Sequence, residues 1–262
     1  MYETIISERR AGNQGWIILN RPERRNSISP KMTFELIDAF RKYDEDDDIK
    51  VVILTGAGDK SFCAGGDLAP DSSGPQAFLD RYESSRKFAE LFRIFENYRK
   101  PIIGRINGDA LGGGFGLAVA CDITIVVETA RMGTPEINIG LFPYIIMATL
   151  MRNTSNPKKL LELMLTGERI SAKEAEQYGF VNYIVSPEQL DQKVDEVIQK
   201  LISKSPAILR MGRRAYYTAR ELEFSKSLEM LSSMLSLNMM AEDLIEGVSA
   251  FFQKRKPEWK GR

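Results

Sequence analysis

The sequence predicts an α/β fold, in which short buried strands alternate with amphipathic helices. Two β-branched runs, residues 17–19 and 51–54, are typical of buried strands, and turn residues follow each of them. Between them, residues 30–43 have the spacing of an amphipathic helix, and Pro30 suits its first turn. Strand, crossover helix and strand at this spacing are typical of parallel α/β architecture.

The same alternation continues along the middle of the chain. We expect a second helix over residues 76–97, a strand that begins at 102–103, and a strand over 123–127. The glycine-rich stretch 108–122 lies between these last two strands and looks like the start of a helix.

Helical patterns dominate the last third of the sequence. Ser171 and Glu174 match a capping box and open a short helix that should stop near Gly179. One more strand is expected over 181–185, and from about Pro187 the pattern is helical almost to the end. These helices break near Ser205-Pro206 and near Glu223. The methionines of the segment 228–240 are expected in the core or in a subunit interface, and these are Met230, Met234, Met239 and Met240.

Composition excludes several classes of chemistry. The 262 residues suit one large domain, or one domain with a helical appendage. Lys+Arg and Asp+Glu both total 36, so net charge gives no reason to expect nucleic acid. The absence of histidine excludes Ser-His-Asp triads and His-ligated metal sites, and we predict no metal site. Cys63 and Cys121, without CxxC spacing, are expected to be reduced and buried.

The sequence also bears on location. The N-terminus MYETIISERR is polar and does not resemble a signal peptide, and no apolar run approaches the roughly 20 residues of a membrane span. We therefore expect a cytoplasmic protein that does not bind membranes.

The segment 108–122, GDALGGGFGLAVACD, places three consecutive glycines where a helix begins. Glycine lets another group approach the backbone closely, and a helix N-terminus offers unpaired N–H donors. The segment therefore predicts either an anion or oxyanion site or a tight turn without a ligand. It does not fit GxGxxG, since Leu117 replaces the last glycine. Residues 56–61 lack the spacing of a phosphate loop.

A second glycine turn favours the oxyanion interpretation. Residues 61–68, SFCAGGDL, follow the strand over 51–54 and also put small residues at a strand exit. Two backbone turns at the ends of neighbouring α/β units could hold one carbonyl oxygen between their N–H groups. Acyl chemistry needs such an arrangement.

These segments resemble the crotonase superfamily, the enoyl-CoA hydratases and isomerases. The resemblance covers nearly the whole chain, because RMGTPEINIGLFP (131–143), LNRPERRNS (19–27) and AFFQKRKPEWKG (250–261) also match in order. It implies a spiral of ββα units with a C-terminal helical segment. Residues 1–200 would form the acyl-CoA-binding catalytic core. Residues 201–262 would complete the CoA pocket and assemble a homotrimer or a dimer of trimers.

The resemblance also implies roles for particular residues. The N–H groups of Gly66 and Gly113 would bind the thioester carbonyl, and Glu136 would transfer protons. An apolar setting should raise the pKa of Glu136. Family hydratases carry a second glutamate where this chain has Gly116. We retain Gly116 and Tyr144 as candidate substrate-binding positions.

The missing carboxylate favours double-bond isomerisation, which needs only one base. The alternatives are hydration, including ring hydration of aromatic acyl groups, decarboxylation of an acyl-CoA, and CoA binding without catalysis. Hydration would need another polar group to hold the water. The candidates for that group are Tyr144, Asp80, Glu83 and Glu90.

Coenzyme A would be part of the substrate, so no separate cofactor is predicted. Arg24, Arg25, Ala64 and Asp67 match positions near the CoA, although the two arginines could equally be plain surface charge. Phe251 and Lys254 match residues that reach the CoA of a neighbouring subunit, and the alternative is an exposed tail. The segment 143–150, PYIIMATL, departs from the glycine-rich turn of family hydratases and should change the acyl end of the pocket.

Overall fold

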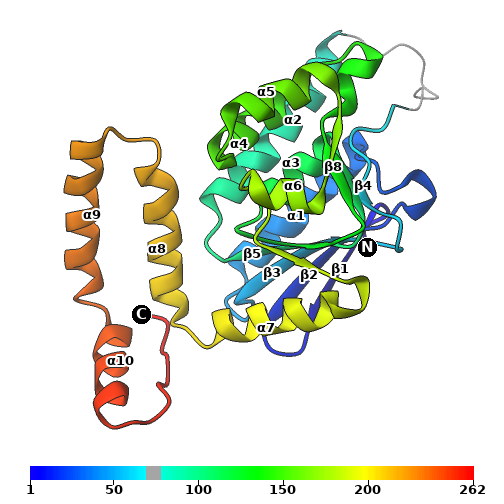
Figure 1. Ribbon diagram of the computed structural model, residues 1–262. Helices are drawn as coiled ribbons and strands as arrows, with labels where there is room; N and C mark the ends of the chain where they lie inside the picture. The colour runs from blue at the N-terminus through cyan, green and yellow to red at the C-terminus, as the bar shows by residue number, and fades with distance from the viewer. Residues whose placement is uncertain (69–77) are drawn as a thin grey trace.

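The strands of the computed structural model, which describes residues 1–68 and 78–262, form two sheets (Figure 1). In the larger sheet β1 is antiparallel to β2, and all the other neighbours are parallel. Its strands in spatial order are β1 (Ile5–Arg10), β2 (Gln14–Leu19), β3 (Val51–Gly56), β5 (Ile102–Ile106), β7 (Ile123–Val127) and β10 (Tyr183–Val185). The strands predicted from β-branched runs are therefore confirmed.

The smaller sheet consists of four strands of three residues each. They are β4 (Ser61–Cys63), β6 (Asp109–Leu111), β8 (Arg131–Gly133) and β9 (Arg169–Ser171). The first three are mutually parallel, and β9 pairs antiparallel with β8. Sequence analysis missed these strands, because three residues are too few to establish a period of two. It also missed β1, whose sequence IISERR starts with two isoleucines and ends in polar and charged residues.

The chain visits the two sheets in turn. Strand β3 lies in the larger sheet, β4 in the smaller one, and helix α2 (Phe78–Asn97) follows. The same order repeats as β5, β6 and α3 (Gly113–Ala120), and again as β7, β8 and α4 (Tyr144–Asn153). Each turn of this spiral thus adds one strand to each sheet and one helix outside them, as expected of ββα units.

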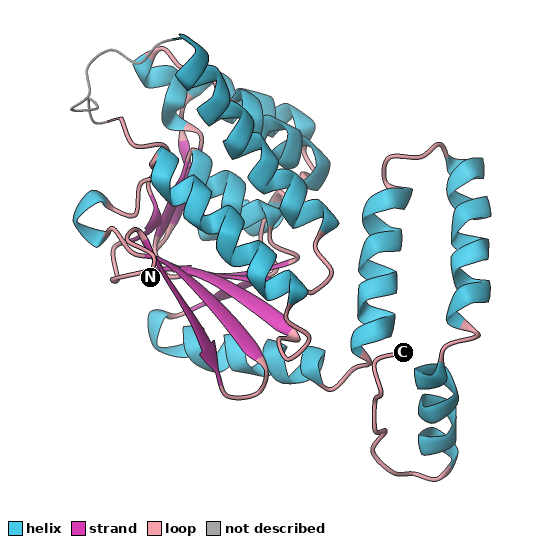
Figure 2. Ribbon diagram, turned by 180° about the vertical axis from the view of Figure 1, so that it is seen from behind, coloured by secondary structure: helices cyan, strands magenta, loops and turns pink. Residues whose placement is uncertain are grey.

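Four further helices complete the core. They are α1 (Pro30–Glu45), α5 (Pro157–Thr166), α6 (Ala172–Gln177) and α7 (Leu190–Ile202). Ser29 caps α1 by accepting from the N–H of Met32, and the capping box of Ser171 and Glu174 opens α6 as predicted. Figure 2 shows α7 across one face of the larger sheet, with the other core helices on the opposite side. Cys63 and Cys121 are free and buried, as expected.

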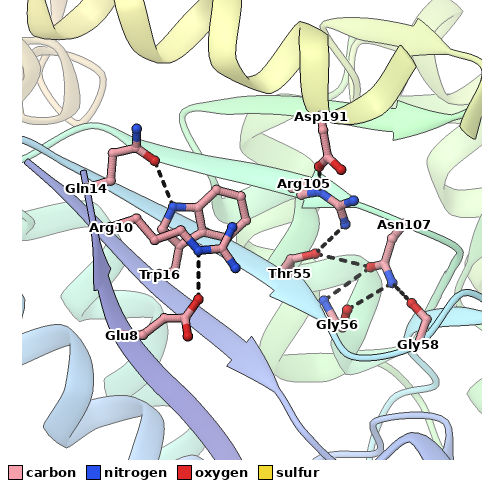
Figure 3. A network of polar contacts seen from close by, with 10 residues as sticks. All are labelled: Glu8, Arg10, Gln14, Trp16, Thr55, Gly56, Gly58, Arg105, Asn107 and Asp191. Atoms are coloured by element: carbon pink, nitrogen blue, oxygen red, sulfur yellow. Dashed lines mark hydrogen bonds and ion pairs between the residues drawn. The ribbon is translucent and has the colours of Figure 1, made fainter. Parts of the chain in front are cut away.

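Polar side chains tie the strand ends of the larger sheet together (Figure 3). The amide of Asn107, just after β5, donates to the carbonyls of Gly56 and Gly58 and accepts from the N–H of Gly56. Arg105 bonds Thr55 and pairs with Asp191 of α7 at 2.6 Å. These bonds fix the loop that leads into β4, and β4 carries the first glycine turn.

Helices α8 (Pro206–Ala219), α9 (Phe224–Asn238) and α10 (Glu242–Phe252) stand apart from the sheets in both views (Figures 1 and 2). No residue of α9 is buried. Met239 and Met240 are 66% and 79% exposed, so the methionine-rich segment does not lie in the core of this chain, and its other expected place, a subunit interface, stays a prediction. The residue boundary expected at 200 falls in the last turn of α7.

One buried ion pair anchors α8 to the core. The Arg213 guanidinium, whose side chain is 7% exposed, lies 2.8 Å from the Asp122 carboxylate. It also donates to the carbonyls of Phe95 and Tyr98 at the end of α2. Tyr217 donates to the other oxygen of Asp122. None of the helices in the described residues has the length and apolar character to cross a membrane.

Candidate active site

The three chain segments singled out by the motifs meet at one edge of the smaller sheet. β4, β6 and β8 are parallel neighbours, so their carboxyl ends lie side by side. Gly65 and Gly66 follow β4, Gly112 and Gly113 follow β6, and Glu136 follows β8. Carboxyl ends of parallel strands are common ligand sites in α/β proteins, because the loops there converge.

The turn after β4 is held by Ile28. The N–H of Ile28 donates to the carbonyl of Gly65 at 2.7 Å, and the N–H of Asp67 donates to the carbonyl of Ile28 at 2.9 Å. Gly65 has φ +97°, which favours glycine. Gly66 between them is exposed, and a Cβ on it would meet nothing within 4 Å. No backbone acceptor among the described residues is bonded to its N–H.

The turn after β6 places a second N–H nearby. Gly112 has φ +51° and donates to the carbonyl of Gly133 at 2.8 Å. Gly113 is the first residue of α3, where N–H groups have no intrahelical acceptor. Within residues 1–68 and 78–262, no hydrogen bond uses the N–H of Gly66 or Gly113. A Cβ on Gly65 would lie 3.5 Å from the nitrogen of Gly113, so the two turns are adjacent.

Glu136 lies directly beside these turns. It belongs to a short 3-10 helix, η2 (Pro135–Ile139), and a Cβ on Gly112 would lie 2.6 Å from its Oε1. Burial raises the pKa of Glu136, partly offset by a hydrogen bond from its own backbone. Its Oε2 and the Thr134 hydroxyl are buried and have no hydrogen-bond partner among the described residues. Such a carboxylate is suited to proton transfer.

Two polar residues near the start of the chain, Arg21 and Asn26, hold the first turn in place. The fully buried Asn26 amide donates to the carbonyls of Ala57 and Ser61 and accepts from the N–H of Arg21. Arg21 pairs with Asp67 at 2.7 Å, and both side chains are less than 20% exposed. Asp67, expected near the CoA, therefore gives its carboxylate to a protein ion pair. Both residues stand in the motif LNRPERRNS, but their partners are distant in sequence.

The position of the missing glutamate is filled by apolar side chains. Gly116 is buried, and a Cβ there would lie 2.7 Å from Cβ of Ile146 and 3.2 Å from Cζ of Phe92. Gly116 was expected to border the substrate. Instead it packs against α4, because α3 and α4 approach closely at this glycine. The bulky segment that follows Pro143 thus compensates for the small residue at 116.

The candidate substitutes for that glutamate are exposed or paired with other side chains. Tyr144 is 69% exposed and lines a hollow of about 350 Å³ between α2, α4 and α8. Asp80 is exposed, Glu83 pairs with Arg86, and Glu90 pairs with Arg41 and Lys87. No cluster of three or more potential metal-ligating His, Cys, Asp or Glu occurs in the described part of the chain.

The expected CoA-binding residues fall into two groups. Arg24 and Arg25 are exposed on the loop around the short 3-10 helix η1 (Pro22–Arg24), and the carbonyl of Arg25 accepts from the N–H of Ala64 at 3.0 Å. This loop is therefore next to the first glycine turn. Phe251, 77% exposed, and Lys254 lie at the end of α10, in the part that stands apart from the sheets (Figure 1). Within one chain they are not brought to Glu136.

Comparison with known proteins gives the family of the chain. The sequence profile described as Enoyl-CoA hydratase/isomerase matches residues 11–262. The chain belongs to this family. Its members act on acyl-CoA thioesters, and the two mixed sheets with C-terminal helices are the crotonase fold.

Relatives and solved structures match over nearly their full length. The chain is 35% identical to a carnitinyl-CoA dehydratase of Escherichia coli, covering 94% of each. It is 31% identical to a crotonyl-CoA hydratase of Syntrophomonas wolfei, covering 97% of each. The crystal structure of an enoyl-CoA hydratase from Mycobacterium smegmatis superposes with a TM-score of 0.93 at 31% identity, covering 98% of this chain and 99% of that one.

Proposed function

We propose that this protein isomerises the double bond of an enoyl-CoA, with Glu136 as its only catalytic carboxylate. One observation carries the proposal. The Glu136 carboxylate lies against Gly112, directly beside the two free N–H groups of Gly66 and Gly113. A thioester carbonyl placed between those N–H groups presents its α-carbon on the side where a base must lie.

The proposed reaction has two proton transfers. Glu136 removes a proton from the α-carbon of a 3-enoyl-CoA, and the electron pair moves onto the thioester oxygen to form a dienolate. The N–H groups of Gly66 and Gly113 donate to that oxygen, and each such donor is typically worth about 3–4 kcal/mol of barrier. The protonated Glu136 then returns the proton to the γ-carbon, giving the conjugated 2-enoyl-CoA.

The packing at Gly116 supports a single-base mechanism. Ile146 and Phe92 fill the space that a side chain at 116 would need. Addition of water needs a second group to activate or hold the water, and position 116 supplies none. The raised pKa of Glu136 suits a group that must both accept and return a proton.

Hydration is the second candidate, and the names of the relatives favour it. Both the carnitinyl-CoA dehydratase and the crotonyl-CoA hydratase are named for adding or removing water. In this reaction Glu136 would activate the water, and its partnerless Oε2 would be the oxygen that holds it. The same carboxylate would then also have to deliver the proton.

We propose further that the CoA binds beside the loop of Arg24 and Arg25 and that copies of the chain form a trimer-based assembly. Exposed cationic side chains suit the phosphates of CoA.

Two exposed apolar surfaces support assembly, since unlike surfaces on one chain can close a ring of copies. One covers α9 and α10. The other runs over η2, α4 and α5, and its exposed members are Ile139, Leu141, Tyr144, Met151, Leu161 and Leu165. In the assembly, Phe251 and Lys254 would reach the CoA of a neighbour.

The ultraviolet absorbance of the conjugated thioester separates the two reactions. Purified protein is mixed separately with a 3-enoyl-CoA and with a 2-enoyl-CoA. A rise with the 3-enoyl ester and no fall with the 2-enoyl ester supports isomerisation. A fall with the 2-enoyl ester supports hydration instead. No change with either contradicts both reactions.

A further inference from the structure

A strip of four apolar side chains covers the face of α3 that continues from Gly113. Gly113 and Gly116 are three residues apart, so they lie on one face of the helix. A Cβ on Gly113 would lie 3.1 Å from Cδ1 of Ile28 and 3.2 Å from Cζ of Phe88. Phe92 and Ile146 cover Gly116 in the same way.

Two side chains of this strip, Ile28 and Phe88, lie against Gly113 and so nearest to the proposed thioester site, and Phe88 is the less buried of the two. Ile28 is 7% exposed, and its backbone is bonded to the Gly65–Asp67 turn, so it has no freedom to yield. Phe88 is only partly buried, and its ring packs edge-on against Phe92 with centroids 5.1 Å apart. The Phe88 ring is therefore packed between Phe92 and Gly113, which its Cζ approaches.

We propose that Phe88 is a specificity-determining residue that limits the length of the acyl group. The inference rests on the proposed placement of the thioester carbonyl between Gly66 and Gly113. From that position an acyl chain that extends along α3 meets the tip of the Phe88 ring before it reaches Phe92 or Ile146. The strip is apolar throughout, so the substrate class is a short hydrocarbon acyl thioester.

The test uses binding of saturated acyl-CoA esters, which cannot undergo double-bond chemistry. Calorimetry measures the dissociation constants of butyryl-CoA and octanoyl-CoA for the full-length wild type and for Phe88→Leu, Phe88→Ala and Phe88→Trp. One methylene in an apolar pocket changes discrimination by about 10- to 200-fold. We expect Phe88→Ala to improve octanoyl-CoA binding relative to butyryl-CoA by about tenfold or more, Phe88→Leu by less, and Phe88→Trp to shift the ratio the other way.

Phe34→Ala is the matched control. It makes the same truncation on α1, where Phe34 is 54% exposed and lies outside the site, and it should leave the ratio unchanged. A ratio that stays within about twofold across the Phe88 variants overturns the inference. If Phe88→Ala does not fold, the inference is still tested by Phe88→Leu and Phe88→Trp, which should shift the ratio of octanoyl-CoA to butyryl-CoA binding in opposite directions.

Turnover measured alongside separates the two proposals. If the wild type converts no enoyl-CoA but the binding ratio follows the size of residue 88, the proposed function fails and the role of Phe88 stands. If the wild type converts enoyl-CoA and the ratio is flat, the role of Phe88 fails and the proposed function stands.

Discussion

The carboxylate of Glu136 packs against the α-carbon of Gly112, so closely that a Cβ on this glycine would lie 2.6 Å from Oε1. The two residues follow different strands of the smaller sheet, Gly112 after β6 and Glu136 after β8, and Gly112 is also the residue before Gly113. The same contact therefore fixes the proposed base and the proposed oxyanion donor relative to each other.

Gly112→Ala should lower both stability and activity. Alanine at φ +51° is strained, and its methyl group would push the Glu136 carboxylate away. We expect a loss of about 1–3 kcal/mol in the free energy of unfolding, measured in urea, and a lower kcat. Gly66→Ala is the control for stability, because its methyl group would meet nothing within 4 Å. Equal stability of Gly112→Ala and the wild type would contradict this packing.

Glu136→Gln should remove turnover while acyl-CoA still binds. The amide keeps the shape of the side chain but cannot accept the proton, and general base catalysis is typically worth about 10²- to 10⁴-fold in rate. Absorbance assays give kcat, and calorimetry gives the dissociation constant of a saturated acyl-CoA. Glu83→Gln, an exposed change on α2, is the control. A Glu136→Gln protein with wild-type kcat would show that another group is the base.

The pH dependence should follow the raised pKa of Glu136. The base is active only when ionised, so the acid limb of kcat/KM should lie above 4.5, the ordinary value for this group. Protonated Glu136 also stabilises the fold. That contribution is fully present below pH 4.5 and is lost as the pH rises through the raised pKa of the folded state.

Glu136→Gln stays neutral and does not undergo this loss. The variant should therefore gain stability relative to the wild type as the pH rises from below 4.5 through the raised pKa of Glu136, as thermal melting at several pH values will show. A constant difference across that range, or an acid limb at or below pH 4.5, would contradict the buried carboxylate.

Gly116→Ala should destabilise the protein, and shortening Ile146 should relieve the effect. The added methyl group overlaps the Ile146 side chain, and overpacking typically costs about 1–3 kcal/mol. In the Ile146→Ala background the same change should cost less, because the space is then available. Urea unfolding of the four proteins of this cycle measures the coupling. Additive effects would mean that the two positions do not compete for one space.

A glutamate at position 116 can test the choice between hydration and isomerisation only in the Ile146→Ala background. Gly116→Glu alone should unfold or destabilise the protein, since Ile146 and Phe92 occupy its path. Combined with Ile146→Ala, it supplies the second carboxylate that family hydratases carry. Hydration of a 2-enoyl-CoA should then rise relative to isomerisation in the absorbance assay. An unchanged ratio in a folded double variant would mean that water activation does not depend on this position.

Arg213→Met should loosen α8 from the core. It removes the guanidinium from Asp122 and leaves that carboxylate with Tyr217 and the N–H of Ile102 as partners. Loss of one member of a buried ion pair typically costs about 3–5 kcal/mol. Hydrogen exchange should increase in α8 more than in the strands of the larger sheet. Adding Asp122→Asn should restore part of the stability, and no restoration would speak against an unpaired charge.

The larger sheet could be predicted from the sequence because its strands carry β-branched runs that are buried on both faces. Val51, Ile103 and Ile125 belong to such runs, and each lies in a parallel strand. The short strands around Cys63 and Ala110 could not be predicted this way. Three residues show no period, and they become strands only because the longer strands before them bring them side by side.

The candidate site was predictable in its parts but not in its surroundings. The glycine turns and Glu136 stand in recognisable motifs, because backbone approach and proton transfer need these residue types at fixed points of the chain. Ile28, Phe88 and Ile146 stand in no such motif, and an apolar residue in a sequence is interpreted as a core residue wherever it occurs. Their role depends on which glycine each side chain meets.

The sequence by itself determined the family, the α/β alternation, the two glycine turns and the identity of the single carboxylate in the motif. The tertiary structure alone decided that Ile146 packs over Gly116, that Asp67 forms an ion pair with Arg21, and that Phe88 packs against Gly113. The physical reason is distance along the chain. Local patterns record propensities over a few residues, whereas these contacts join segments tens of residues apart whose positions follow only from the packing of the whole spiral.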